Sequence, residues 1–473
     1  MHQPYPLLCL GLIHLLLATQ GCTHTTSTPP TTPPQQTAPD KPTPDKPTPD
    51  KPVSSKPAPS FVDLEHIKAA LTLDVSDPST PRLSGDVTLS ANAQAATVMT
   101  LNAVGFESHQ ITSSPPARWD YDGQRFQARW DTPVDGPVSI HVTYTVQPSK
   151  GLGTGPEALW TTFHTWHWLP VRDDPSERAT LDLHIDAPKG WTTIATGDGP
   201  DKPGPDIASR LPHPSYTYGF FAGRLDAPPA HQGQLHVWGA DSQDKAQRVL
   251  QRTQAAVDRW KTHLKHDPGD YVQVFVPGRA AQELAGMAFI SAGYLDRLLK
   301  TPDEDWLLVH EMAHQGWGNR VTCATWGDFW LNEAIVAWWV GRDKAIRGQV
   351  DAYEQELALW TKRTARILDK GGERRIARPG HGVEGAGGPL AYNAGATLID
   401  DLSRAVGVEI FEGVLADLLQ RSADTGLSLT TEHFLTSLPL NEDACEIARC
   451  RLKDAGATCA PLPNSPPAPT GQP

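Results

Sequence analysis

The stretch from Val309 to Val340 reads VHEMAHQGWGNRVTCATWGDFWLNEAIVAWWV. His310 and His314 stand four residues apart, a spacing that places both imidazoles on one face of a helix, about one turn from each other. Glu333 follows after eighteen intervening residues, inside a second apolar-periodic run. Two imidazoles and one carboxylate leave a tetrahedral zinc ion with one open position for water. We therefore predict one zinc ion per chain, held by His310, His314 and Glu333.

Glu311 lies between the two histidines, and its side chain projects beside the face that they share. Zinc lowers the pKa of a bound water towards ~7, so a neighbouring carboxylate can take the proton as general base. A chance match to His-Glu-x-x-His is the alternative, but the flanks favour a helix. Residues 301–304 (TPDE) form a capping-box pattern with proline at the first helical position. Gly316, Gly318 and Asn319 predict where that helix stops.

The run HEMAHQGWGNRVTCATWGDFWLNEA resembles the zinc signature of the aminopeptidase N family of gluzincin metallopeptidases. That family's pattern is HExxHxWxGNxVT, then a tryptophan, then LWLNEG, and its third ligand lies at the spacing of Glu333. The resemblance implies that His310, His314 and Glu333 are ligands and that Glu311 is the general base and acid. The matching residues after the histidines are Gly318, Asn319, Val321, Thr322, Trp326, Trp330, Leu331 and Asn332.

The resemblance also implies a fold class, α+β and multidomain. An N-terminal antiparallel β saddle or sandwich domain would precede a thermolysin-like, mostly helical catalytic domain. The hydrophobic pattern agrees with this order, because short alternating or β-branched runs between Pro, Gly, Asp and Ser precede the helical periodicities. The expected strands include 67–75, 84–89, 98–101, 138–146 and 181–185, followed by a helix over 244–264 and a buried strand over 271–276.

The chain of 473 residues divides into five parts by composition. Residues 1–22 read as an export signal that ends in a sequence similar to a bacterial lipobox, with Cys22 as the lipidation site. Residues 23–59 repeat PDKPT and form a Pro-rich disordered linker. The β domain is expected over 60–228, the zinc peptidase domain over 229–438, and a Cys-containing, Pro-rich tail over 439–473. These features predict an exported bacterial lipoprotein, periplasmic or anchored to the outer membrane.

One motif departs from the family pattern. The family carries GxMEN on a strand edge beside the zinc, where its glutamate binds the substrate's free amine. Aligned on Met287, this chain has Gly286 and Met287 but Ala288 at the glutamate position. These three residues are the expected substrate-binding segment, and alanine cannot hold an ammonium group by a charge-assisted hydrogen bond. Glu283 lies close by in sequence, so a compensating role for it stays open.

Tyr392 begins the segment YNAGA, which resembles the family's Y-x-K-G-A. The resemblance implies that its hydroxyl donates a hydrogen bond to the oxyanion of the tetrahedral intermediate. The alternative is a buried structural tyrosine. Helical periodicity continues through Leu402, and two further helices are expected between Glu409 and Leu438.

Charge and cysteine content limit the partners and the compartment. The formal net charge of −13 argues against nucleic acid as a partner. An exported protein meets an oxidising compartment, so two disulfides are expected, with three connectivities open. The four cysteines concerned are Cys323, Cys445, Cys450 and Cys459.

These observations predict a zinc-dependent metallopeptidase that acts on peptides or proteins, similar to aminopeptidase N but with altered recognition of the N-terminal amine. Two alternatives remain open at this stage. One is an endopeptidase or another hydrolase with the same site, which the change at Ala288 suggests. The other is a catalytically weak, zinc-containing binding protein.

Overall fold

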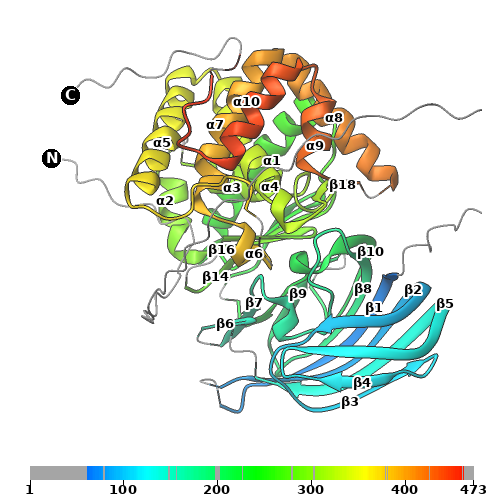
Figure 1. Cartoon of the computed structure of the whole chain (residues 1–473). Helices are drawn as coiled ribbons and strands as arrows, with labels where there is room; N and C mark the ends of the chain where they lie inside the picture. The colour runs from blue at the N-terminus through cyan, green and yellow to red at the C-terminus, as the bar shows by residue number, and fades with distance from the viewer. Residues whose placement is uncertain are drawn as a thin grey trace, which may run out of the picture.

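The computed structural model describes two parts of the chain that differ in secondary structure (Figure 1). Strands fill the first part up to Gly223, and helices dominate after Gln243. This confirms the expected α+β fold. The described residues are 61–462, with gaps at 78–79, 148–149, 156, 198–202, 226, 279–280, 302–303, 379, 381, 426 and 461. The export signal, Cys22 and the Pro-rich linker lie outside the described residues.

The first part is built on a seven-stranded sheet with the order β10-β8-β1-β2-β5-β3, in which β4 also pairs with β5. Its strands alternate buried and exposed residues, because one face packs on a core while the other meets solvent. The pairs are antiparallel except β1 with β8, which is parallel. The strands are β1 (Phe61–Asp74), β2 (Arg82–Asn102), β3 (Phe106–Ser114), β4 (Arg118–Tyr121), β5 (Arg125–Val146), β8 (Arg178–Asp186) and β10 (Asp206–Pro214).

A second, four-stranded sheet has the order β6-β7-β11-β9 and lies between the large sheet and the helical part (Figure 1). Almost all residues of β7, β9 and β11 are buried, as expected for strands covered on both faces. The strands are β6 (Leu152–Gly155), β7 (Ala158–Thr161), β9 (Thr192–Ala195) and β11 (Phe220–Gly223).

The helical part begins with a five-stranded sheet of order β12-β13-β14-β16-β15. Its central strand β14 (Tyr271–Val276) has the predicted bounds and is buried throughout. Helix α1 (Gln243–Leu264) also confirms the sequence prediction, and Ser242 caps it by accepting a hydrogen bond from the Lys245 amide. The other strands are β12 (Ala230–Gln232), β13 (Leu235–Trp238), β15 (Ala281–Leu284) and β16 (Met287–Ser291).

The remaining helices pack around a large core that includes Trp260, Trp330, Trp338 and Trp339. None of the described helices is long and apolar enough to cross a membrane. These helices are α2 (Leu295–Lys300), α3 (Trp306–Ala313), α4 (Trp330–Ile346), α5 (Val350–Asp369), α6 (Gly382–Ala386), α7 (Pro389–Val406), α8 (Val408–Thr425), α9 (Thr431–Ser437) and α10 (Glu442–Lys453).

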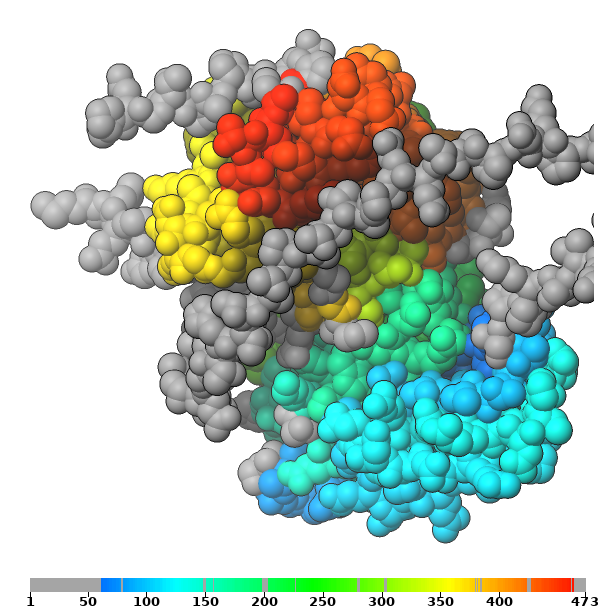
Figure 2. Space-filling view, viewed as in Figure 1, coloured from blue at the N-terminus to red at the C-terminus, as the bar shows by residue number. Residues whose placement is uncertain are grey.

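The two parts share a core. The small sheet contributes Trp160, Ile194 and Phe221 to a buried cluster that also contains Met287 and Phe289 of β16. The space-filling view shows the green part of the chain in contact with the cyan strands below and with the yellow and orange helices above (Figure 2). Strand β16 is therefore braced from the β domain on one face.

Two local expectations were wrong. Helix α3 begins at Trp306 rather than at the proline of residues 301–304, with Asp305 as its N-cap. The tail, for which no secondary structure was predicted, contains helix α10. One disulfide joins Cys450 to Cys459, whereas Cys323 and Cys445 are buried thiols without a bridge among the described residues. Cys323 packs in a separate cluster with Tyr216, Trp326 and Phe329, and no other described cysteine belongs to that cluster.

Candidate zinc site

Two helices bring the predicted ligands together. His310 lies in the last turn of α3, His314 is the C-cap of that helix, and Glu333 lies in the first turn of α4. Helices α3 and α4 contact each other, so residues separated by about twenty positions in sequence share one site. His314 and Glu333 are buried, and the His310 side chain is 12% exposed.

The three ligand atoms form a nearly equilateral triangle. Nε2 of His310 lies 3.2 Å from Nε2 of His314, and Oε2 of Glu333 lies 3.6 Å from each of these nitrogens. Ligands about 2.0–2.2 Å from a tetrahedral zinc ion are separated by roughly 3.3–3.5 Å. Glu333 Oε2 is buried and has no hydrogen-bond partner among the described residues. The donor set therefore fits zinc, and these residues are the zinc site.

The backbone around the site orients the ring of His314. Its Nδ1 lies 2.9 Å from the carbonyl oxygen of Trp317, so an Nδ1–H donates there and leaves Nε2 free to bind metal. The Tyr216 hydroxyl donates to the Gly318 carbonyl at 3.0 Å and accepts from Nδ2 of Asn332 at 3.1 Å. A tyrosine of the β domain thus links the loop after α3 to the helix that carries Glu333.

Burial and mutual charge set the electrostatics of the site. Burial raises the pKa of Glu311 well above its usual value, and the carboxylates of Glu283 and Glu333 add to that effect. Burial also acts to raise the pKa of Glu333, but the imidazoles of His314 and His310 outweigh it and lower that pKa to about 2. For His310, burial is the largest cause and lowers the pKa. The two imidazoles therefore share a buried site with the carboxylates of Glu311 and Glu333, a combination of charges that suits a divalent cation.

Glu311 and Tyr392 flank the ligands. Glu311 is buried, and its Oε2 has no hydrogen-bond partner among the described residues. Tyr392 lies on α7, and its ring is nearly parallel to that of His310, with the centroids 6.2 Å apart. Helix α7 begins three residues before Tyr392, at Pro389, slightly earlier than the sequence pattern indicated. The structure thus brings both predicted catalytic residues to the site, and their roles stay predictions.

The segment expected to bind substrate follows a tight turn between β15 and β16. Gly286 adopts a φ of 70° at this turn, a conformation that suits glycine. Met287 and Ala288 are both buried, but they point to opposite faces of β16, as alternation along a strand requires. Met287 packs toward the β domain, and Ala288 packs toward the zinc helix. The role of this segment in binding stays a prediction.

Sequence reasoning missed the residues that fasten this turn to the zinc helix. The side-chain oxygen of Gln315 accepts a hydrogen bond from the Gly286 amide at 2.9 Å, and its Nε2 donates to the Leu284 carbonyl at 3.2 Å. Nδ2 of Asn319 donates to the same carbonyl at 2.9 Å. Gln315 follows the second histidine directly, so its place in the motif was the available signal.

Comparisons with known proteins agree with this geometry. A family model described as the peptidase family M1 domain matches residues 303–444. Aminopeptidase B of Mus musculus is 27% identical over 180 residues, which cover 36% of this chain and 27% of the relative. Aminopeptidase N of Streptomyces lividans is 27% identical over 194 residues, which cover 35% of this chain and 22% of the relative. The chain thus spans about a quarter of the length of these curated relatives.

A solved structure shows the same two-part fold. The M1 zinc metallopeptidase of Deinococcus radiodurans superposes with a TM-score of 0.65 at 23% identity. The match covers 85% of this chain and 96% of that protein, so it extends across both the β domain and the helical domain. Together, the ligand triangle, the match of residues 303–444 to the peptidase family M1 domain and the two-domain fold show that this chain is similar to peptidase family M1.

Proposed function

We propose that this protein is a zinc metallopeptidase that hydrolyses peptide bonds, similar to an aminopeptidase but with altered recognition of the substrate amine. The observation that carries the proposal is the ligand triangle of His310, His314 and Glu333, with the buried carboxylate of Glu311 beside it. Oε2 of Glu311 has no hydrogen-bond partner within the described part of the chain. A zinc ion in this triangle would supply Lewis-acid chemistry, polarising a carbonyl and lowering the pKa of water.

The protein's own residues account for the proton transfers and the charge. Glu311 accepts a proton from the attacking water and returns it to the leaving amine, so one carboxylate serves as base and then as acid. Tyr392, stacked beside His310, donates its hydroxyl proton in a hydrogen bond to the oxyanion that forms on the carbonyl.

The names of the relatives support a peptide substrate. The curated matches are aminopeptidases, and the M1 metallopeptidase from Deinococcus radiodurans has been solved with a Tyr-Ser-Ala substrate bound. Altered amine recognition rests on the chain itself, because Ala288 offers no carboxylate at the position where the resembling family has one. A buried ammonium group needs such a partner.

The Glu311→Gln variant tests the proposal. We expect this variant to bind zinc as the wild type does, because the three ligands are unchanged, and to lose roughly 10²- to 10⁴-fold in turnover. A library of free and N-acetylated peptides is digested by both proteins, with zinc measured by atomic absorption on the same samples. The exposed Glu107→Gln exchange serves as control. Full activity in Glu311→Gln would overturn the assignment.

We also propose that the protein is exported and tethered to a membrane through a lipid on Cys22. The support is the short apolar run before Cys22, the Pro-rich segment after it and the disulfide between Cys450 and Cys459, since disulfides form in oxidising compartments. In a bacterial host, wild-type protein should partition into detergent and a Cys22→Ser variant into buffer. Equal partitioning of the two proteins would contradict a lipid anchor.

A further inference from the structure

Side chains of the β domain hold the turn that follows the zinc helix α3. The Tyr216 hydroxyl donates a hydrogen bond to the carbonyl oxygen of Gly318 at 3.0 Å. Nη2 of Arg178, at the start of β8, donates to the carbonyl oxygens of Asn319 and Arg320, each at 2.8 Å. Backbone carbonyl groups that leave water need such partners. Three consecutive carbonyl groups of the turn therefore accept hydrogen bonds from the β domain.

The same turn carries the carbonyl group that orients a zinc ligand. Nδ1 of His314 donates to the carbonyl oxygen of Trp317 at 2.9 Å, and the peptide bond of that carbonyl leads directly into Gly318. A methyl group added at Gly318 would lie 3.4 Å from Nδ1 of His314 and 3.5 Å from the hydroxyl oxygen of Tyr216. The φ of Gly318 is 115°, a conformation that favours glycine. The ligand ring and the tyrosine hydroxyl therefore lie against the same glycine.

The Tyr216 hydroxyl also contacts the helix that carries the third ligand. It accepts a hydrogen bond from Nδ2 of Asn332 at 3.1 Å, and Asn332 directly precedes Glu333 on α4. A tyrosine hydroxyl can donate and accept at the same time, so it serves both segments at once. Burial raises the pKa of Tyr216 well above its usual value, so the hydroxyl keeps the proton that it donates to Gly318.

Packing fixes the rest of the Tyr216 side chain. The residue is 1% exposed, and the centroid of its ring lies 5.5 Å from that of Trp326 and 5.9 Å from that of Phe329. It belongs to the short 3-10 helix η2 (Ser215–Thr217), where the Ser215 hydroxyl donates to the Arg172 carbonyl at 2.8 Å. A side chain held in this way gives its hydroxyl a fixed position, and ligands supported from fixed positions bind metal more tightly.

We propose that Tyr216 is a positioning residue of the zinc site, through which the β domain sets the spacing between His314 and Glu333 before the metal binds. Its hydroxyl acts through the turn that orients His314 and through the residue before Glu333. Without this hydroxyl, the Gly318 carbonyl and the Asn332 amide lose a buried partner, and the two ligand-bearing segments can shift apart. Because zinc affinity does not depend on turnover, this role is independent of the proposed peptidase function.

Zinc affinity, measured without substrate, tests this role. Tyr216→Phe keeps the ring and removes only the hydroxyl. Tyr218→Phe is the matched control, because Tyr218 is equally buried and its hydroxyl lies 2.7 and 2.9 Å from the carbonyl oxygens of Ala179 and His213, both in the β domain. Competition with a chelator of known zinc affinity should show roughly 10- to 100-fold weaker binding in Tyr216→Phe and wild-type binding in Tyr218→Phe. The metal-free variants should lose similar amounts of stability to denaturant, which separates positioning from a general loss of packing.

Asn332→Ala removes one of the same hydrogen bonds from the side of α4, and it provides the test if Tyr216→Phe does not fold. Asn332→Ala should also weaken zinc binding, and the double variant should bind zinc no more weakly than Tyr216→Phe alone, because the amide has already lost its partner. Wild-type zinc affinity in Tyr216→Phe or Asn332→Ala, an equal loss in Tyr218→Phe, or losses that multiply in the double variant would overturn the proposal. Zinc binding that depends on Tyr216 in a protein that cleaves no peptide would support the positioning role and refute the peptidase proposal.

Discussion

The two ends of helices α3 and α4 carry two buried groups of charge that are completed in different ways. At one end lie the zinc ligands with Glu311, where the Oε2 atoms of Glu311 and Glu333 have no hydrogen-bond partner among the described residues. At the other end lie Asp305, at the start of α3, and Asp343, near the end of α4. Both of these aspartates are held by arginines.

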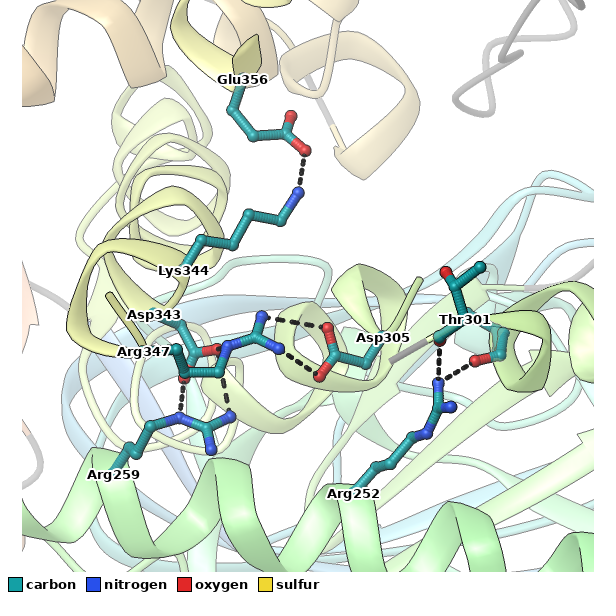
Figure 3. Close-up of polar contacts among 9 residues, drawn as sticks. Arg252, Arg259, Thr301, Asp305, Asp343, Lys344, Arg347 and Glu356 are labelled. Carbon is teal, nitrogen blue, oxygen red and sulfur yellow. Dashed lines mark hydrogen bonds and ion pairs between the residues drawn. The ribbon is translucent and has the colours of Figure 1, made fainter. Parts of the chain in front are cut away.

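The second group is a closed network (Figure 3). Nε of Arg259, on α1, lies 2.5 Å from one oxygen of Asp343, and its Nη2 lies 3.1 Å from the other. Arg347 forms a fork on Asp305, with both contacts at 3.2 Å, and its Nε lies 3.1 Å from Asp343. Beside this network, Lys344 pairs with Glu356 of α5 at 2.5 Å. The network therefore joins helices α1, α3 and α4 through protein atoms alone.

The two ends show how a structural buried charge differs from a functional one within the same core. A buried carboxylate paired with guanidinium groups holds helices together, and removing one partner leaves an uncompensated charge. A buried carboxylate without a protein partner reduces stability until a metal or substrate completes it. Substitutions at the arginine-paired end should therefore lower stability, whereas substitutions at the zinc end should lower activity and leave stability nearly unchanged.

The largest expected effect is on the network. Asp343→Asn should lower the free energy of unfolding by about 3–5 kcal/mol, because it leaves Arg259 and Arg347 buried without their shared carboxylate. Chemical denaturation monitored by tryptophan fluorescence measures this change. The exposed pair of Arg118 and Asp131 offers a control, since Asp131→Asn should alter stability by less than about 1 kcal/mol. Equal losses of stability in Asp343→Asn and Asp131→Asn would contradict a structural role for the buried network.

At the zinc end, Tyr392→Phe should change catalysis rather than stability. Loss of one oxyanion donor should reduce kcat by about 10²- to 10³-fold, which corresponds to about 2.7–4 kcal/mol of transition-state stabilisation. The variant should retain its zinc, because Tyr392 is not a ligand. Single-turnover hydrolysis of a free tripeptide, with zinc content on the same sample, provides the measurement. An unchanged kcat would make Tyr392 a packing residue beside His310.

Asp173 extends the comparison to the β domain. Its Oδ1 is buried without a hydrogen-bond partner among the described residues, and burial with the nearby Asp174 raises its pKa to about 7. Because the folded-state pKa lies above the unfolded value of 3.8, the contribution of Asp173 to stability is most favourable below about pH 4 and falls as pH rises to 7. Asp173→Asn should remove this pH dependence and raise the free energy of unfolding by about 1–2 kcal/mol at pH 8, a value reduced to allow for the partial exposure of the side chain. Denaturation midpoints of the wild type and of Asp173→Asn, measured from pH 4 to 8, test this. The same change with pH in both proteins would contradict the prediction.

The smallest effect is expected for Glu311→Gln in metal-free protein. Because burial raises the pKa of Glu311 and its Oε2 has no partner, the neutral amide should leave the free energy of unfolding unchanged or raise it by about 1 kcal/mol. Thermal unfolding in the presence of a chelator measures this. A loss as large as that of Asp343→Asn would mean that Glu311 is a structural residue.

The sequence predicted those parts of the molecule that depend on local spacing. The ligand pair needs only the helical repeat between His310 and His314, and the alternating strands and the amphipathic pattern of α1 fixed the order of β and helical regions. The start of one helix was predicted incorrectly. The capping pattern at residues 301–304 placed the start of α3 too early, because Asp305 is held by Arg347 from the far end of α4 and supplies the N-cap instead.

The sequence by itself thus predicted the zinc ligands, Glu311 as the general base and the α+β fold class, because short segments carry the spacing of the histidines, the periodicities of strands and helices, and the motifs that resemble a known family. Only the tertiary structure decided which cysteines pair, how Tyr392 stacks on His310, and that Glu283 stands opposite Ala288 on the face toward the zinc helix. These facts depend on strand register and helix packing. Strand register and helix packing are set by contacts between side chains far apart in the chain, so a local pattern of residues does not predict them.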